Sequence, residues 1–225
     1  MGDTLTSEKS YLLLSGAISA NLQFLSPEVV KHYLEHKDQI PFALARGFTV
    51  APNPLEKFAL LADLGIITVK ADYVHGKQIS SFLEKYPKMF YDYDKNITDA
   101  NFPRPSRILK PGDKLWVRAY KQIVGGTTTS EERMTFLETQ NVAIYTGAQG
   151  SSLVFEQKRD QLPKGFWYAS FDKEERLWKD SDGNRGVPGV HADLNGDFNW
   201  SLGYLEGVWD VNRAFFGFCD LSSET

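Results

Sequence analysis

The chain has 225 residues, of which 42% are apolar and 24% are charged, with a formal net charge of −4. This length suits one large domain or two small ones, and the apolar fraction is sufficient for a buried core. The acidic balance argues against a general nucleic-acid binder, which usually carries a basic face, and the single cysteine, Cys219, excludes an intramolecular disulfide.

The first hundred residues are predicted to be mostly helical. Ser26-Pro27-Glu28 combines an N-cap, a proline at the first helical position and an acid in the first turn, so it predicts a helix to about His36. Asn53-Pro54 repeats this signal before apolar residues at helical spacing, and Gly65 would end that second helix. A strand over 66–69, a helix over about 76–86 and a strand over 89–93 complete the region.

The best candidate for a domain boundary is the segment 99–114, which contains three prolines and many polar residues. We therefore expect a mainly helical accessory domain with short strands over residues 1–105 and a second domain over residues 106–225. The job of the accessory domain is not indicated by its sequence, although oligomerisation or attachment to another protein would suit it.

The second half begins with a strand over 115–124. In it Trp116, Arg118, Tyr120 and Gln122 alternate with Val117, Ala119 and Ile123. Thr129-x-x-Glu132 is a capping box that opens a helix, and a second helix is expected over 151–162. Short strands follow at 166–171, 177–178, 187–190, 198–202 and 214–218. The first and last strands of this half can pair, which would bring its two ends together.

Residues 182–220 are crowded with glycine, asparagine, aspartate and tryptophan. Glycine and asparagine favour turns over helices, so the segment predicts loops on a frame of short strands, where binding functions commonly lie. No catalytic constellation is evident there, and the segment is more typical of a recognition surface than of an active site.

Several stretches together resemble the variable proteins of diversity-generating retroelements, in particular a group from uncultivated small-genome bacteria. The resemblance covers roughly residues 110–221 and is carried by GAQG at 147–150, LVFEQKRDQLP at 153–163, the strands at 166–171 and 177–178, and the block 182–220. It implies an α+β fold with a C-type-lectin-like domain at the C-terminus, preceded by the mainly helical region.

The resemblance also implies where the ligand-binding residues lie. In such proteins a reverse transcriptase randomises template adenines, so AAC codons become NNC codons, which cannot encode Trp or Glu; Trp200, Glu206 and Trp209 would therefore be fixed. Varied residues must not carry the fold, because random substitution in a core costs several kcal/mol. The implied varied positions, within about 185–214, are Gly186, Gly189, His191, Ala192, Asn195, Asn199, Ser201, Tyr204, Gly207, Val208, Asp210, Val211, Asn212 and Ala214.

Metal and cofactor sites are not expected. Asp193-x-Asn195-x-Asp197 and Asp180-x-Asp182-x-Asn184 have the spacing of calcium ligands but lack the glycine and glutamate of that loop, so we interpret both as turns. The Glu-Pro-Asn triplet of sugar-binding lectins is missing. His32 and His36 are four residues apart without the HExxH pattern, and we interpret Cys219 as a small core residue.

The sequence therefore favours a non-enzymatic binding protein whose ligand is a protein surface, with no nucleic-acid partner, no membrane span and a homo-oligomer left open. A convincing signal peptide is not found, so the cytoplasm is the default location. One alternative is an enzyme related to formylglycine-generating enzymes, which share the lectin-type fold; an acid pair such as Asp193 and Asp197 keeps it open. The other alternative is a structural assembly component.

Overall fold

The computed structural model describes residues 57–140, 142 and 144–221, which belong to a compact unit that begins at Pro54. This part of the chain is α+β and mostly sheet. Its elements are β1 (Phe58–Thr68), α5 (Gln78–Lys85), β2 (Phe90–Tyr93), β3 (Lys114–Gln122), β4 (Thr128–Thr129), α6 (Ser130–Thr139), α7 (Gly147–Lys158), η2 (Arg159–Gln161), β5 (Phe166–Ala169), η3 (Glu174–Arg176), β6 (Trp178–Lys179), β7 (Arg185–Ala192), β8 (Phe198–Tyr204), β9 (Val208–Trp209) and β10 (Arg213–Asp220).

The main sheet has eight strands in the order β1-β3-β10-β5-β7-β8-β2, with β6 paired to β7. A small second sheet joins β4 to β9. The predicted pairing of the first and last strands of the second half is confirmed, because β3 and β10 run antiparallel with Tyr120 opposite Phe215. The chain thus returns from the loop-rich C-terminal segment to the strand that opened this half.

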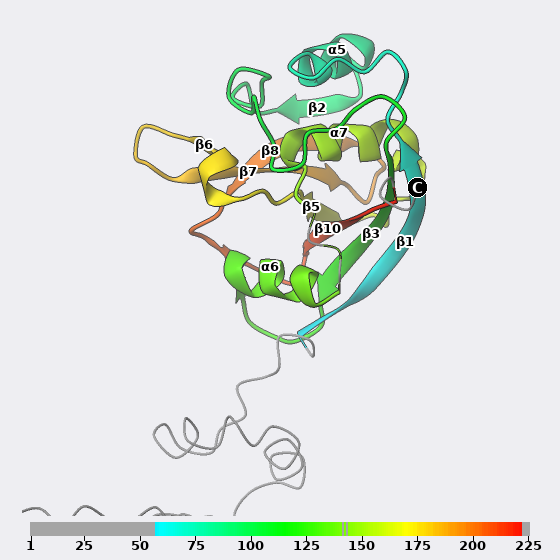
Figure 1. Cartoon of the computed structure of the whole chain (residues 1–225). Coiled ribbons are helices and arrows are strands. Elements are labelled where there is room, and N and C mark those ends of the chain that lie inside the picture. The colour runs from blue at the N-terminus through cyan, green and yellow to red at the C-terminus, as the bar shows by residue number, and fades with distance from the viewer. Residues whose placement is uncertain (1–56, 141, 143, 222–225) are drawn as a thin grey trace, which may run out of the picture. The chain divides into compact units, whose positions relative to one another are not determined.

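Helices α6 and α7 cover opposite faces of the sheet (Figure 1). On one face Phe136 of α6 packs against Tyr120 and Phe215, with ring centroids 5.0 and 6.0 Å apart. On the other face Leu153 and Val154 of α7 belong to the same buried cluster as the next residues along β10, Phe216 and Phe218. Alternate residues of each strand therefore face different helices, as the period of two requires.

β1 corrects the expected helix after Asn53-Pro54: residues 58–68 form a strand, in which Gly65 has φ +68°. Two irregularities in the pairing of β1 with β3 insert extra residues before Ala62 and before Gly65. The bulges interrupt the regular alternation of faces. Phe58 packs against Phe136 and Phe215 on the α6 face, whereas Leu64 and Ile67 belong to the buried cluster of Leu153 and Val154. Of the residues whose spacing predicted a helix, Phe58 is buried and Leu61 and Ala62 are half-buried in this strand.

The boundary expected between residues 105 and 106 does not coincide with a boundary of this compact unit. β1, from the expected accessory domain, pairs along its length with β3, and β2 pairs with β8. The described part of that expected domain is one helix and two strands and not mainly helical. The strand over 89–93 and the helix over 76–86 are confirmed as β2 and α5, while the helix from Pro27 to His36 lies outside the described residues.

The capping box of α6 is confirmed. The Thr129 hydroxyl accepts the Glu132 backbone N–H at 3.2 Å, and the Glu132 carboxylate accepts the Thr129 N–H at 2.8 Å. Lys57 Nζ also donates to Glu132 Oε1 at 2.5 Å, which ties the helix to the start of β1. These three hydrogen bonds therefore fix the N-terminus of α6.

We expect Thr129→Ala to lower the free energy of unfolding by about 1 kcal/mol, because the N-terminus of α6 loses one side-chain acceptor. Chemical denaturation would measure the change. The matched control is Thr127→Ala, which alters an exposed threonine two residues earlier and should change stability by less than about 0.5 kcal/mol. Equal effects of the two substitutions would show that the cap contributes nothing.

Helix α7 begins at Gly147, four residues before the start expected from the sequence. Glycine is a poor helix former, but at Gly150 a Cβ would lie 1.8 Å from Thr146 Oγ1 and 3.1 Å from Phe218 Cζ. The close approach of Thr146, and to a lesser extent of Phe218 on β10, thus requires the glycine that the propensity disfavours. Among the described residues, no helix has the length and apolarity needed to cross a bilayer.

A buried carboxylate, Asp172, joins three segments beside the start of α7. It accepts hydrogen bonds from the backbone N–H and the hydroxyl of Ser106 and from the Lys173 N–H, and a Cβ on Gly147 would lie 3.1 Å from its Oδ2. Burial raises the pKa of Asp172 to about 6, against the opposing effect of these hydrogen bonds.

This raised pKa predicts a pH dependence of stability. Below pH about 4 both states hold the proton, and between about 4 and 6 the unfolded chain loses it first, so the free energy of unfolding falls as the pH rises. A shift of about two units corresponds to roughly 3 kcal/mol at most. Urea denaturation at pH 4 and pH 7 would measure the free energy of unfolding of Asp172→Asn and of the wild type. From pH 4 to pH 7 the difference between them should shift in favour of the variant by up to that amount. Parallel pH profiles of the two proteins would contradict the prediction.

Candidate functional site

A row of side chains crosses five neighbouring strands on the α6 face of the sheet. Arg213 on β10 is paired with Trp167 on β5, Trp167 with His191 on β7, and His191 with Asn199 on β8. Asn199 is paired in turn with Asp92 on β2, and its Nδ2 donates to Asp92 Oδ2 at 3.2 Å. Directly paired residues point to the same face, so the five side chains form one continuous line.

A hollow of about 390 Å³ lies over this row. β8 contributes Ser201 beside Asn199, and the loop between β9 and β10 contributes Asp210 and Asn212. A register shift between Phe90 and Asp92 adds an extra residue, Tyr91, at the edge. The lining is Tyr91, Trp167, His191, Asn199, Ser201, Asp210, Asn212 and Arg213.

Two stacked indoles support the hollow from within. Trp167 and Trp209 are both buried, and their ring centroids lie 5.5 Å apart with an interplanar angle of 23°. The Trp167 Nε1–H donates to the Ser201 hydroxyl at 3.0 Å. A Cβ at Gly189 would lie 2.3 Å from Trp167 Cζ2, and one at Gly203 would lie 2.6 Å from Trp209 Cη2. The two glycines therefore leave the space that the indoles occupy.

The guanidinium of Arg213 lies over the Trp167 ring, 4.9 Å from its centroid. This cation–π contact fixes the orientation of a long side chain, which is half-buried. Among the described residues no carboxylate forms an ion pair with Arg213. Its N–H groups are therefore positioned at the hollow without a charged partner from this part of the chain.

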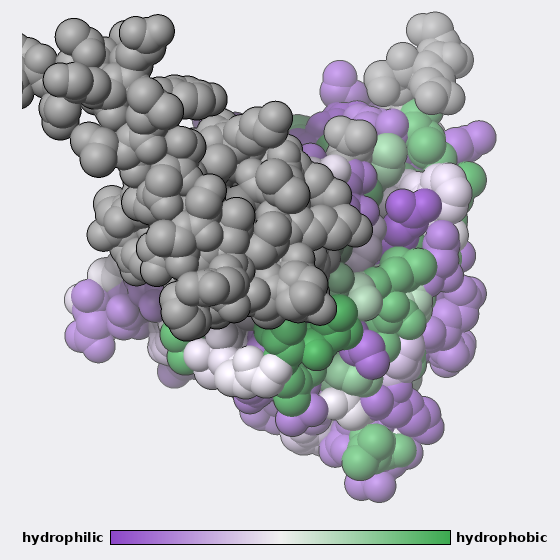
Figure 2. All heavy atoms as spheres, turned by 90° about the horizontal axis from the view of Figure 1, so that it is seen from below, coloured by the Kyte–Doolittle hydropathy of each residue, from purple (hydrophilic) through white to green (hydrophobic). Residues whose placement is uncertain are grey.

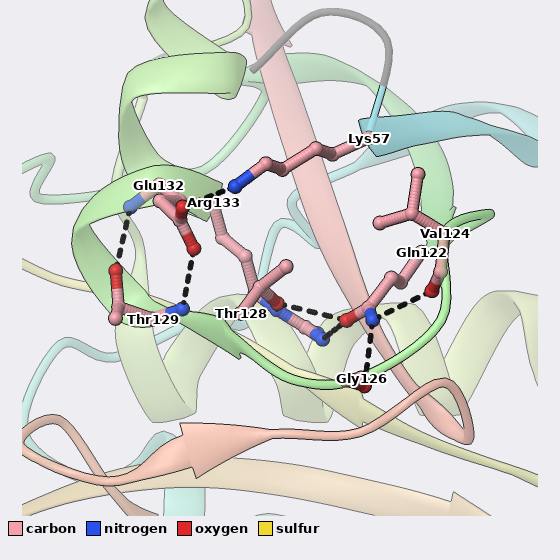
Figure 3. Close-up of polar contacts among 8 residues, drawn as sticks. All are labelled: Lys57, Gln122, Val124, Gly126, Thr128, Thr129, Glu132 and Arg133. Atoms are coloured by element: carbon pink, nitrogen blue, oxygen red, sulfur yellow. Dashed lines mark hydrogen bonds and ion pairs between the residues drawn. The ribbon is translucent and has the colours of Figure 1, made fainter. Parts of the chain in front are cut away.

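Arg133 of α6 holds the loop that forms one side of the hollow. Its guanidinium donates to the backbone oxygens of Asp210, at 3.2 Å, and Arg213, and Nε donates to Thr128 Oγ1 at 2.9 Å. Gln122 Oε1 accepts a further bond at 3.3 Å, as Figure 3 shows. The side chain is fully buried, and this desolvation lowers the pKa of Arg133 to about 9.

The structure divides the predicted varied positions into three groups. Five line the hollow: His191, Asn199, Ser201, Asp210 and Asn212. Five others lie on turns or exposed strand ends near it or farther along the strands: Asn195, Tyr204, Gly207, Val208 and Val211. The remaining four are buried and cannot belong to an exposed binding surface: Gly186, Gly189, Ala192 and Ala214.

The buried four correct the sequence-based list, and the reason is packing. Ala192 and Ala214 have 2% and 0% of their surface exposed. A Cβ at Gly186 would lie 3.0 Å from Leu202 Cδ1, and Gly189 lies under the Trp167 ring. The codon rule tests only which amino acids an NNC codon can encode, so it does not separate small core residues from exposed ones.

Three residues of the hollow were missed by the sequence: Tyr91, Trp167 and Arg213. Trp167 and Tyr91 lie far from the 185–214 segment in sequence and reach the site only through strand pairing. Arg213 lies between two predicted positions and is itself a residue that an NNC codon encodes. Its position inside the segment was therefore a usable signal.

The aspartate-rich segments form turns. Asp180 accepts backbone N–H groups of Asp182 and Asn184, both at 2.9 Å, and the Asp193 N–H donates to the Asp197 oxygen at 2.9 Å. In residues 57–140, 142 and 144–221, no group of three or more His, Cys, Asp and Glu side chains is arranged to hold a metal ion. His32 and His36 lie outside these residues. Cys219 is half-buried in β10 against the main core cluster.

The side of the molecule on which α6 lies carries hydrophilic and hydrophobic residues next to one another (Figure 2). Such mixed chemistry matches the lining of the hollow, where aromatic, amide, hydroxyl and charged groups meet.

The chain matches no protein-family model, no curated protein and no solved structure. The likeness to retroelement variable proteins therefore rests on the residues of this chain alone.

Proposed function

We propose that this protein is a non-enzymatic binder whose C-terminal part has a C-type-lectin-like fold and presents a ligand-binding face diversified by a retroelement. The observation that carries the proposal is the convergence of His191, Asn199, Ser201, Asp210 and Asn212 in one hollow. They come from two strands and one loop, and all five are among the positions that the sequence predicts to vary.

The architecture around the hollow supports a surface that tolerates change. Its floor consists of buried indoles and its loop is held by Arg133, mainly through backbone oxygens. Backbone contacts do not depend on the side chains of Asp210 or of residues up to Arg213. Exposed side chains on such a rigid frame can change without loss of the core.

The lining is typical of protein recognition. Tyr91 of the lining is 60% exposed and offers contact area with little conformational entropy to lose; Tyr204, 48% exposed at the end of β8, does the same outside the hollow. Asn199, Asn212 and Ser201 offer adaptable hydrogen bonds, as the polar residues of antibody paratopes do. The pairing of β3 with β10 and the two helices between them are the order that a C-type-lectin-like domain requires, and they support that part of the proposal.

The direct test is to sequence the gene and its flanking DNA from many cells of the source population. We expect a reverse-transcriptase gene nearby, a near-copy of the 185–218 coding region, and substitutions confined to template adenines. Within that segment, substitutions should fall on codons for the lining residues and spare the buried Gly189 and Ala214. An invariant segment without a repeat would refute diversification and leave a hollow of unassigned purpose.

A binding test follows once a ligand is isolated from a random peptide library. Tyr204→Ala combined with Asp210→Ala should abolish binding, because the first removes the exposed ring at the end of β8 and the second removes a carboxylate that lines the hollow. The Asp210 carboxylate accepts one backbone N–H, that of Asn212 at 2.9 Å, so the thermal midpoint should fall by only a few degrees. If the double variant unfolds, these residues belong to the scaffold and the assignment fails.

A further inference from the structure

We infer that the hollow binds an acidic segment of its protein ligand, with a ligand carboxylate held by Arg213. This inference rests on the proposed binding function and adds the chemistry of the partner. It starts from the Arg213 guanidinium, which lies over the Trp167 ring, 4.9 Å from its centroid, at the β10 end of the row.

The hydrogen-bond partners of the charged groups in and beside the hollow indicate that the ligand group is a carboxylate. Asp92 accepts a hydrogen bond from Asn199, and Asp210 accepts one from the Asn212 backbone N–H. Arg213, by contrast, makes its described side-chain contact through the π face of Trp167, which leaves the N–H groups at the edge of the guanidinium unused. A planar guanidinium with a free edge matches a carboxylate through two parallel hydrogen bonds.

The geometry of the row selects an extended segment. Five strands at a spacing of ~4.8 Å place Arg213 and Asp92 roughly 19 Å apart. An extended peptide rises ~3.3 Å per residue, so about six residues would lie along the row. The positive charge of Arg213 at one end and the negative charge of Asp92 at the other favour one orientation, with the acidic residue of the ligand over β10.

The middle of the row supplies hydrogen bonds without a fixed charge requirement. His191 and Asn199 lie between the charged ends, and Ser201 lies beside them with its hydroxyl already accepting from Trp167. These side chains would form hydrogen bonds with neighbouring ligand residues, and diversification would change which ligand residues they bind. Arg213 would bind the ligand carboxylate in every variant that keeps this arginine.

The test uses the full-length protein and a phage-displayed library of random linear dodecapeptides, which have no free C-terminal carboxylate in the display. We expect the selected peptides to be enriched in Asp or Glu at one position. Synthetic versions with an amidated C-terminus should bind wild type, and affinity should drop at least tenfold when that acid is replaced by Asn or Gln.

Variants of the protein separate the anchor from general effects. Arg213→Gln should lose at least tenfold in affinity for the acidic peptides, Arg213→Lys should retain part of it, and Arg104→Gln, at an exposed loop arginine, should lose nothing. Circular dichroism and the thermal midpoint of Arg213→Gln show whether the fold persists. A folded Arg213→Gln that binds as well as wild type overturns the inference.

Two other outcomes separate this inference from the proposed function. Peptides without acidic enrichment, whose binding is lost in Ser201→Trp, would overturn the carboxylate anchor while leaving the hollow as a binding site. Selected peptides that bind equally well to Ser201→Trp, or no selected peptides at all, would overturn both the anchor and the hollow.

Discussion

Arg133→Ala is expected to lower the free energy of unfolding by about 4 kcal/mol, among the largest effects that a single change can have here. The substitution removes a hydrogen bond from four oxygen acceptors, on Gln122, Thr128, Asp210 and Arg213. Gln122 Oε1 still accepts from the Thr128 hydroxyl and the Asp210 oxygen from the Arg213 N–H, so Thr128 Oγ1 and the Arg213 oxygen carry most of the loss. Each buried unsatisfied group costs about 1–3 kcal/mol. The relief of a buried charge offsets part of the loss, since burial lowers the pKa of Arg133 to about 9.

Urea denaturation of Arg133→Ala and of Arg104→Ala provides the comparison, because Arg104 is an exposed loop arginine. The control should stay within about 0.5 kcal/mol of wild type. Arg133→Lys keeps the charge but not the planar fork, so it should fall between the two. A stable Arg133→Ala protein would mean that the carbonyls of the 210–213 loop find other donors.

Gly189→Ala is expected to destabilise the protein by about 3 kcal/mol and to disturb the hollow. The new methyl group would lie 2.3–2.5 Å from three atoms of the Trp167 ring, and that ring also stacks on Trp209 and contacts the Arg213 guanidinium. A rigid ring cannot move by tenths of an ångström without displacing its neighbours, and overpacking of this kind costs about 1–3 kcal/mol or more.

The control is Gly125→Ala, at a glycine where a Cβ would meet nothing within 4 Å and φ is not positive. A double-mutant cycle with Trp167→Ala identifies the cause. If the collision is with the indole, Gly189→Ala should cost at least 1 kcal/mol less in the Trp167→Ala background. Additive effects would place the strain elsewhere.

The same collision bears on diversification. A varied Gly189 would place random side chains in the space of Trp167, so most variants would lose the support of the hollow. A population survey that found free variation at Gly189 would therefore contradict the described packing. Variation at Asn199 or Asn212, whose side chains face the hollow, carries no such cost.

Local signals in the sequence were enough to identify the elements that depend on local physics. The capping box at Thr129 and Glu132 predicted the start of α6, since both hydrogen bonds lie within four residues. Alternation predicted β3, and turn-forming residues marked the hairpin between β7 and β8. The α+β class followed from these elements and is what the described residues show.

Long-range packing decided what the sequence alone predicted wrongly. The apolar residues of β1 have helical spacing, but they form a strand that pairs with β3, some fifty positions away. α7 begins at a glycine-containing segment because a Cβ at Gly150 would lie 1.8 Å from Thr146 Oγ1 and 3.1 Å from Phe218 Cζ of β10. The deciding partner lies far along the chain for β1 and partly so for α7, and intrinsic propensity carries no information on either contact.

Some residues of the candidate site were predicted from the sequence, and others were found only in the tertiary structure. Composition and the resemblance predicted recognition residues in the C-terminal segment, and five of the predicted positions lie together in the hollow. Only the tertiary structure separated these from the buried Gly186, Gly189, Ala192 and Ala214. It also added Tyr91 and Trp167, because strand pairing brings β2 and β5 beside β7 and β8, and no pattern within one segment encodes which strands become neighbours.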